Sequence, residues 1–349
     1  MTEQPDIFSV MTVHALDVSP DTAVRVARDH WGIAGAAHAL TGERDRNFHF
    51  SADDGREFVL KFANPVENAA VVDMQIKALD HIAKIDPGLA VPLVIAMPDG
   101  QVETLVPHET GGIQRVRLLS WVPGDLLHSS RRSPAQRVAC GRALARVERA
   151  LKTFQHPASG HALIWDMQHA LRLREVADTM PSADASAVLE DILAEFEARV
   201  TPALPRLRRQ VLYNDMNGGN TLVDPADHSR FAGLIDFGDM VETTVAIDVA
   251  TGATAQLAPD MDDVDAIALF ISGYHEILPL QPEEIDLVPL LTATRIAMSL
   301  TLQAWHRAMQ PHNPHYADVT PTVIARRLAH IAAIRAPDTA AHLRHACLV

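Results

Sequence analysis

Residues 211–239 decide the fold: they read Val211-Leu212-Tyr213-Asn214-Asp215-Met216-Asn217-Gly218-Gly219-Asn220-Thr221-Leu222-Val223 and, after a turn, Phe231-Ala232-Gly233-Leu234-Ile235-Asp236-Phe237-Gly238-Asp239. Two apolar segments flank a polar, glycine-rich loop, and a third apolar segment ends directly in an acidic residue. This pattern predicts three short strands separated by turns. Each polar motif alone would also suit an ordinary turn, in which Asp and Asn are common. The ordered series strand, Asp-x4-Asn, strand, strand, Asp-Phe-Gly-Asp is far more specific than its parts.

The polar residues of this stretch have the chemistry that phosphoryl transfer requires. Such a reaction needs a carboxylate that accepts the proton of an attacking hydroxyl, and oxygen ligands that hold Mg²⁺ against the phosphates. Asp215 is the candidate catalytic base. Asn220, five residues later, and Asp236 are the candidate Mg²⁺ ligands.

Positive charge for the phosphates is expected from the N-terminal part of the chain. Lysine is rare in the sequence, and Lys61 is the one that ends a predicted strand, in Val59-Leu60-Lys61. A charge that protects a sheet edge from aggregation is the simpler interpretation. The functional interpretation is a lysine that binds phosphate and is held by an acid on the following helix, for which Asp73 is preferred over Glu67.

Composition excludes several classes of protein. The 349 residues carry 30 Lys and Arg against 44 Asp and Glu, a formal net charge of −14. An acidic chain with few aromatic residues is a poor general binder of nucleic acid or of anionic membranes. Two cysteines are too few for a disulfide framework, and neither a signal peptide nor a membrane span is expected. These features indicate a cytoplasmic protein.

The chain is expected to form two lobes, with residues 1–122 rich in strands and residues 123–349 mostly helical. Pro123-Gly124 is the candidate hinge. In the first lobe the patterns predict helices at 20–31 and 64–85 and strands within 46–62 and at 91–97, 102–106 and 114–121. In the second they predict, around the strands of residues 210–238, helices from 134 and at 166–178, 185–199, 246–258, 262–275, 287–309 and 321–335.

On these residues the sequence resembles the aminoglycoside phosphotransferase and choline kinase group, which consists of small-molecule kinases with a two-lobed, protein-kinase-like α+β fold. Val59-Leu60-Lys61, Asp215-x4-Asn220 and Asp236-Phe237-Gly238 match its landmarks in order, and the likeness extends from about residue 25 to 310. Within the group, Ile164-Trp165-Asp166 and Ile235–Met240 are most similar to hydroxylysine kinase and to phosphotransferase domains fused to class III aminotransferases.

The resemblance implies a role for each matched position, with ATP and Mg²⁺ as cofactors. Asp215 would be the base and Asn220 and Asp236 would hold Mg²⁺. The nucleotide would be bound by Lys61 with Asp73, by the turn 42–47 including Asn47, and by the backbone of Leu119, Ser120 and Trp121. Tyr213 and Asp248 would brace the catalytic loop. The chain departs from the family at Tyr213-Asn214, where His-Gly is usual, and at Asp73, where Glu is usual.

The acceptor is expected to be a small amino alcohol or hydroxylated amino acid. Possible substrate contacts are Trp165, Asp166, Asp239, Arg295 and Trp305, although Asp166 also suits a helix N-cap and Trp305 a core position. An aminoglycoside acceptor, or a degenerate protein that binds nucleotide without catalysis, remains open. The sequence does not indicate the oligomeric state.

Overall fold

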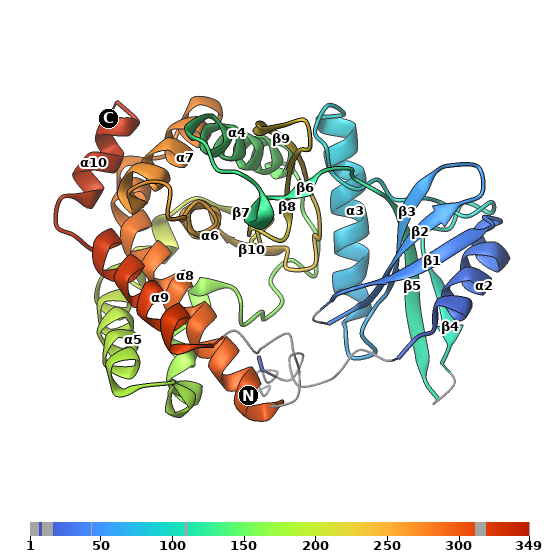
Figure 1. Ribbon diagram of the computed structural model, residues 1–349, viewed down its shortest axis with the longest axis horizontal. Coiled ribbons are helices and arrows are strands. Elements are labelled where there is room, and N and C mark those ends of the chain that lie inside the picture. The colour runs from blue at the N-terminus through green and yellow to red at the C-terminus, as the bar shows by residue number, and fades with distance from the viewer. Residues whose placement is uncertain (1–6, 9–16, 43, 109–110, 311–318, 349) are drawn as a thin grey trace. The chain divides into compact units, whose positions relative to one another are not determined.

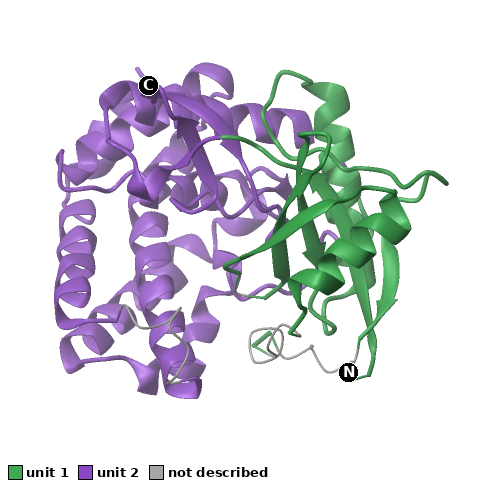
Figure 2. Cartoon of the chain, turned by 45° about the vertical axis from the view of Figure 1, so that its right-hand side comes forward, with its two compact units in different colours: residues 1–123, 156–158 green, residues 124–155, 159–349 purple. Residues whose placement is uncertain are grey.

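The computed structural model describes residues 7–8, 17–42, 44–108, 111–310 and 319–348, and the chain divides into two compact units. Unit 1 comprises residues 1–123 and 156–158, and unit 2 comprises residues 124–155 and 159–349 (Figure 2). The chain therefore leaves unit 1 after Pro123, and only a short segment returns to it.

Unit 1 is a five-stranded antiparallel sheet with one helix on each face (Figure 1). The strand order is β1-β2-β3-β5-β4. One hydrophobic cluster joins the first helix to the sheet through Trp31, Phe48 and Phe50, and a smaller one joins the second helix through Val72 and Ile76. The elements are α2 (Pro20–Trp31), β1 (Gly35–Leu40), β2 (Arg46–Ala52), β3 (Glu57–Phe62), α3 (Ala69–Ile85), β4 (Thr104–Pro107) and β5 (Ile113–Ser120).

The sequence patterns of unit 1 give most of these elements. Ser19 caps α2 and Gly32, with φ of 68°, ends it, so the helix has the bounds predicted at 20–31. Helix α3 begins later than predicted because Asn68, whose side chain accepts from Ala70 N at 2.9 Å, is its N-cap. The strand expected at 91–97 is wrong: only Val94 forms a bridge there. Strand β1, which is rich in alanine, was not expected.

Unit 2 is mostly helical around short strands (Figure 1). Its strands are β6 (Asp125–Leu126), β7 (Arg209–Leu212), β8 (Thr221–Asp224), β9 (Asp227–Leu234) and β10 (Val241–Thr244). Its α-helices are α4 (Pro134–Leu151), α5 (Ala183–Glu195), α6 (Val245–Thr254), α7 (Asp263–Ile277), α8 (Pro282–Met309), α9 (Pro321–Ile334) and α10 (Thr339–Ala346). The 3-10 segments Leu127–Ser129, Met167–Thr179 and Leu204–Arg206 and the π turn Phe196–Val200 complete it.

The strands of unit 2 carry the stretch with which the sequence analysis began. Strand β7 pairs with β10, and β8 lies between β6 and β9, all antiparallel. The polar loop therefore leaves β7 and enters β8, and Asp236 follows the end of β9. Strand β10 and helix α10 were not expected, and the helix predicted at 166–178 is a 3-10 segment.

Helix α8 is the element that could be mistaken for a membrane span. By length and composition it is long and apolar enough to cross a bilayer, but most of that stretch is buried inside unit 2. The core helix of a globular protein has the same properties. Helices α4 and α7 pack so closely that a Cβ atom at position 141 would lie 1.9 Å from the Phe270 carbonyl oxygen. Glycine at position 141 therefore permits this packing.

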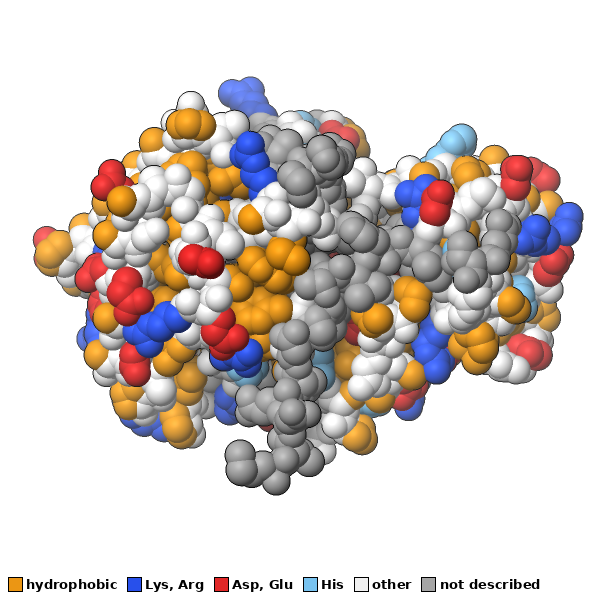
Figure 3. Space-filling view, turned by 90° about the horizontal axis from the view of Figure 1, so that it is seen from below, with side chains coloured by type: hydrophobic (Ala, Val, Ile, Leu, Met, Phe, Trp, Pro, Cys, Tyr) orange, Lys and Arg blue, Asp and Glu red, His pale blue; other side chains and the backbone are white. Residues whose placement is uncertain are grey.

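The negative charge of the chain is dispersed over the face seen in Figure 3. Acidic side chains there stand next to Lys and Arg side chains, and no broad acidic patch is visible among the described residues. Ion pairs such as Arg174 with Glu190 and Glu197 are typical of unit 2. Exposed pairs of this kind contribute little to stability.

Candidate functional site

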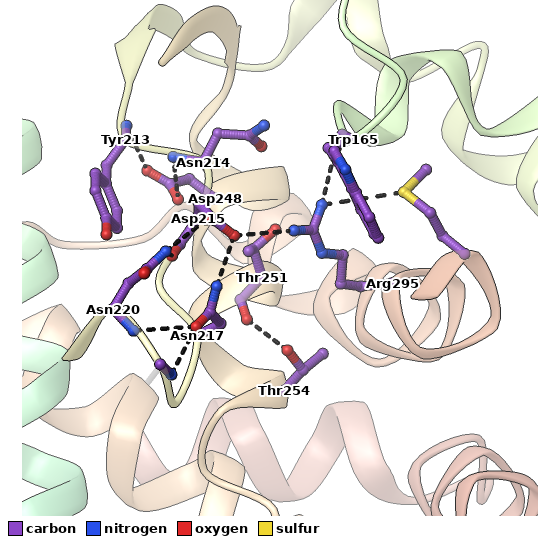
Figure 4. A network of polar contacts seen from close by, with 12 residues as sticks. Trp165, Tyr213, Asn214, Asp215, Asn217, Asn220, Asp248, Thr251, Thr254 and Arg295 are labelled. Carbon is purple, nitrogen blue, oxygen red and sulfur yellow. Dashed lines mark hydrogen bonds and ion pairs between the residues drawn. The ribbon is translucent and has the colours of Figure 1, made fainter. Parts of the chain in front are cut away.

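The loop between β7 and β8, residues 213–220, presents Asp215 through an unusual backbone turn. Asn214 has φ of 62°, in the left-handed region that Asn tolerates better than most residues. The carboxylate of Asp248, on α6, accepts hydrogen bonds from Tyr213 N at 3.2 Å and from Asn214 N at 3.0 Å (Figure 4). Asp248 thus contacts the backbone of the loop that carries Asp215, and its bracing role in catalysis stays a prediction.

Burial strongly affects the Asp248 carboxyl. It is fully buried in unit 2, and this desolvation raises the pKa of Asp248 to about 7, although the two backbone N–H groups oppose the shift. A carboxylate that accepts hydrogen bonds from two backbone N–H groups is suited to holding a loop, because it satisfies buried donors that would otherwise have no partner.

Three side chains orient the carboxylate of Asp215. Asn217 Nδ2 donates to Oδ1 at 2.9 Å, Asn220 Nδ2 donates to Oδ2 at 2.6 Å, and Arg295 Nη2 lies 3.4 Å from Oδ1. These contacts come from the loop itself and from α8 (Figure 4). The Asp215 side chain still has 19% of its surface exposed, so an incoming hydroxyl can reach it.

The electrostatic surroundings of Asp215 are mostly acidic. Burial and the nearby charge of Asp239 raise the pKa of Asp215 well above its ordinary value, and Arg295 and Asn217 act in the opposite direction. Asp239 is itself buried, with 6% exposure. The arrangement places one guanidinium among several carboxylates.

Asn220 and Asp236 lie side by side because Ile235 N donates to the Asn220 carbonyl at 2.9 Å. The Asn220 amide donates its N–H groups to Asp215, and within the described residues its Oδ1 accepts no hydrogen bond. Asp236 is exposed and has φ of 56°. An amide oxygen left available beside an exposed carboxylate fits a hard divalent cation such as Mg²⁺.

Tyr213 joins the Asp215 loop to the Asp236 segment. Its hydroxyl donates to the Ile235 carbonyl at 2.5 Å, and its ring lies 4.8 Å from the ring of Phe237. The tyrosine found in place of the usual histidine therefore links the two segments that carry the predicted base and metal ligands.

Lys61 in unit 1 has an acidic neighbour, but it is Asp45. Lys61 Nζ and Arg117 Nη2 each lie 3.7 Å from Asp45 Oδ2. Lys61 and Arg117 are direct cross-strand neighbours on β3 and β5, where two like charges would repel. Asp45 offsets this repulsion, and Gln75 of α3 accepts from Arg117 at 2.9 Å.

The predicted pairing of Lys61 with Asp73 is wrong in this structure. Asp73 instead accepts from Lys77 at 2.6 Å, one helical turn along α3, and from His156 at 3.0 Å. Partial burial opposes ionisation of Asp73, but these two donors outweigh it and lower the pKa of Asp73. The Asp73 side chain is 44% exposed and belongs to another face of the helix than buried Gln75.

The residues predicted to border a nucleotide lie at neighbouring places in unit 1. Asn47 pairs with Lys61 across β2 and β3, and its buried Oδ1 has no hydrogen-bond partner within the described residues. Leu119 and Ser120 end β5, and the Trp121 ring lies 4.1 Å from the ring of His49. Of the turn 42–47, Glu43 lies outside the described residues. Nucleotide binding by these residues stays a prediction.

Of the residues predicted to contact substrate, only Asp239, Trp165 and Arg295 lie near Asp215. Trp165 and Arg295 meet near Asp215, with the guanidinium carbon 4.9 Å from the centre of the Trp165 ring. Asp166 is fully buried and accepts a hydrogen bond from Gln168 N at 3.0 Å. It is therefore the N-cap of the following 3-10 segment, which was the alternative to a substrate contact. Trp305 is ten residues further along α8 than Arg295, about 15 Å in a regular helix, and is 8% exposed.

Three residues with a clear place in these clusters were not singled out by the sequence: Asp45, Arg117 and Asn217. Asp45 immediately precedes β2, and Arg117 becomes a neighbour of Lys61 only through the β3–β5 register. Asn217 lies inside the loop motif, and its Oδ1 accepts from Gly219 N at 2.7 Å and from Asn220 N at 3.1 Å. The density of Asn between positions 214 and 220 was the available signal for it.

Comparisons with known proteins agree on one family. The model of the phosphotransferase enzyme family matches residues 38–284. Hydroxylysine kinases of Danio rerio and Xenopus laevis are 25% and 23% identical to the chain. The alignments cover 90% of this chain and 92% of the first relative, and 87% of both chains for the second.

Solved structures share the fold at low identity. A microcompartment-associated aminopropanol kinase has a TM-score of 0.68 at 16% identity and covers 90% of this chain and 95% of its own. The amicoumacin kinase hAmiN, in complex with AMP-PNP and Ca²⁺, has a TM-score of 0.67 at 14% identity, with coverages of 91% and 93%. This chain belongs to the phosphotransferase enzyme family, has a protein-kinase-like fold, and is a small-molecule kinase that acts on a hydroxyl acceptor.

Proposed function

We propose that the protein is an ATP- and Mg²⁺-dependent kinase that phosphorylates a hydroxyl group of a small amino alcohol or hydroxylated amino acid. The observation that carries this proposal is the Asp215 carboxylate, oriented by Asn217 and Asn220 and still accessible. The names of relatives support the acceptor class, since they include hydroxylysine kinases and an aminopropanol kinase.

Each proposed role follows from a side chain's chemistry. Asp215 would accept a hydrogen bond from the acceptor hydroxyl and take its proton as the oxygen attacks. Asn220 Oδ1 and the Asp236 carboxylate would hold Mg²⁺, which when bound supplies positive charge against the phosphates. Lys61, held near Asp45, would bind the nucleotide phosphates.

The charges around Asp215 support an acceptor that carries an amine. The buried Asp239 lies close enough to Asp215 for its charge to raise the pKa of that carboxyl, so two acidic groups share this part of unit 2. An ammonium group is attracted to such surroundings. The proposal includes a cytoplasmic location, where ATP and Mg²⁺ are supplied, and a small molecule as the partner.

The test is ADP release from Mg²⁺–ATP with a panel of acceptors: 5-hydroxylysine, ethanolamine, choline, homoserine and an aminoglycoside. The proposal expects turnover with one of the first four and its loss when Mg²⁺ is removed by EDTA. Turnover with the aminoglycoside alone would replace the proposed acceptor class. A protein that binds ATP but releases no ADP with any acceptor would favour a degenerate nucleotide-binding protein.

A further inference from the structure

Arg295 is a buried cation in direct contact with the proposed catalytic base. It comes from α8, has 6% of its surface exposed, and places Nη2 3.4 Å from Asp215 Oδ1. Its Nη1 donates to the Trp165 carbonyl at 2.5 Å, and its guanidinium carbon lies 4.9 Å from the Trp165 ring centre. Trp165 and Asp215 therefore hold the guanidinium in place (Figure 4).

The contacts of Arg295 leave part of the guanidinium available. A guanidinium has five N–H donors. In the described part of the chain, Nη1 donates to Trp165 and approaches Met298 Sδ at 4.0 Å, and Nη2 approaches Asp215, but Nε has no hydrogen-bond partner. A fixed guanidinium with donors to spare is the group that binds carboxylates with two parallel hydrogen bonds.

The charge of Arg295 is unexpected if the acceptor carries only amines. Desolvating a guanidinium is costly, and next to Asp215 it would repel an acceptor's ammonium group. An acceptor that also carries a carboxylate removes the conflict, because its carboxylate can pair with Arg295 while its ammonium faces the acidic groups. Arg295 is in contact with Asp215, which would bind the reacting hydroxyl. The carboxylate of the acceptor must therefore lie within a few carbon atoms of that hydroxyl.

We infer that Arg295 binds the carboxylate of the acceptor, so that the enzyme selects hydroxylated amino acids over amino alcohols. This inference rests on the proposed kinase function and narrows it. Trp165 acts as a positioning residue, since its ring lies next to the guanidinium and its carbonyl group accepts a hydrogen bond from it.

The test compares two matched acceptors, 5-hydroxylysine and its decarboxylated counterpart 1,5-diaminopentan-2-ol, by kcat/KM with saturating Mg²⁺–ATP. The wild-type enzyme is expected to favour the amino acid by about 10- to 100-fold, the range of a charge-assisted hydrogen bond. Equal kcat/KM for the two acceptors would overturn the inference while leaving the kinase function intact. If neither these two acceptors nor any member of the wider panel is phosphorylated, the proposed kinase function is overturned, and the inference with it.

Variants then assign the preference to Arg295. Arg295→Met should abolish the preference, mainly by raising KM for 5-hydroxylysine, and Arg295→Lys should keep part of it. Arg307→Met, an exposed position on the same helix, is the matched control and should keep the full preference. An equal loss of kcat for both acceptors in Arg295→Met would show that the residue only orients Asp215, which contradicts the inference. Because the wild-type comparison needs no variant, a variant that fails to fold does not remove the test.

Discussion

Two charged clusters carry the proposed chemistry, and they are built in different ways. In unit 2, Asp215 is held by neighbours in its own loop, Asn217 and Asn220, and by backbone N–H groups fixed on Asp248. In unit 1, Lys61 lies inside a sheet and faces Arg117 on the next strand, with Asp45 between the two. The first cluster depends on a local loop, and the second depends on strand register.

This difference explains how each cluster tolerates change. The Asp215 loop needs one residue with φ of 62°, supplied by Asn214, and a carboxylate behind it. The Lys61 cluster needs two strands in register and one carboxylate that offsets two cations. Substitutions in the first should therefore affect turnover most, and substitutions in the second should affect both stability and nucleotide binding.

The largest effect is expected for Asp215→Ala. Loss of the group that accepts the hydroxyl proton should lower kcat by about 100- to 10,000-fold. The measurement is ADP release with the acceptor identified from the panel, together with ATP binding by calorimetry, which should hardly change. Asp227→Ala, at the exposed first residue of β9 in the same unit, is the matched control. Near wild-type kcat in Asp215→Ala would exclude Asp215 as the base.

The contrast between Asp45→Asn and Asp73→Asn tests the Lys61 cluster. Asp45→Asn leaves two buried cations without their shared carboxylate and should lower the free energy of unfolding by about 2 kcal/mol and weaken ATP binding. Asp73→Asn removes an ion pair that is largely exposed and should cost less than about 1 kcal/mol. Urea unfolding and ATP titration of both variants measure the contrast. A larger effect from Asp73→Asn would restore the pairing that the sequence suggested.

The pH dependence of stability tests how Glu148 is buried next to Asp248. Burial and the nearby charge of Asp248 raise the pKa of Glu148 well above its ordinary value, and the Tyr274 hydroxyl donates to it. Its contribution to stability is therefore complete below its unfolded pKa and is lost as the pH rises through its folded pKa. Glu148→Gln should raise Tm relative to the wild type by a few degrees at pH 8 and hardly at pH 5. A difference in Tm that does not change with pH would contradict this account.

The smallest effect is expected for Tyr213→Phe. The variant keeps the ring contact with Phe237 but loses the hydrogen bond to the Ile235 carbonyl, which should cost about 1 kcal/mol of stability. Because Ile235 precedes Asp236, the Mg²⁺ concentration for half-maximal activity should rise a few-fold. An unchanged Mg²⁺ dependence would show that Tyr213 does not position the metal ligand.

The sequence was most informative where neighbours along the chain make the site. The strands that flank Asp215 and the order of Asp215, Asn220 and Asp236 could be read from one apolar and polar pattern, because one loop and its adjacent strands bring them together. The fold class followed from the resemblance of this stretch, together with Val59-Leu60-Lys61, to a known family.

The partners of Lys61 and Asp215 that come from distant segments could not be predicted. Arg117 reaches Lys61 through strand register, and Arg295 reaches Asp215 from 80 positions away along the chain. On α3, Asp73 and Gln75 are two residues apart and so lie on different faces, and the sequence does not say which face meets the sheet. Strand β1 was missed because its alanines carry no strong strand preference.

The most direct test of the central claim is to identify the product by ³¹P NMR after incubation with Mg²⁺–ATP and 5-hydroxylysine. The account predicts a new phosphomonoester resonance coupled to the proton on the hydroxyl-bearing carbon, formed by the wild-type enzyme and absent with Asp215→Ala. Formation of inorganic phosphate alone, or equal ester formation by both proteins, would contradict it.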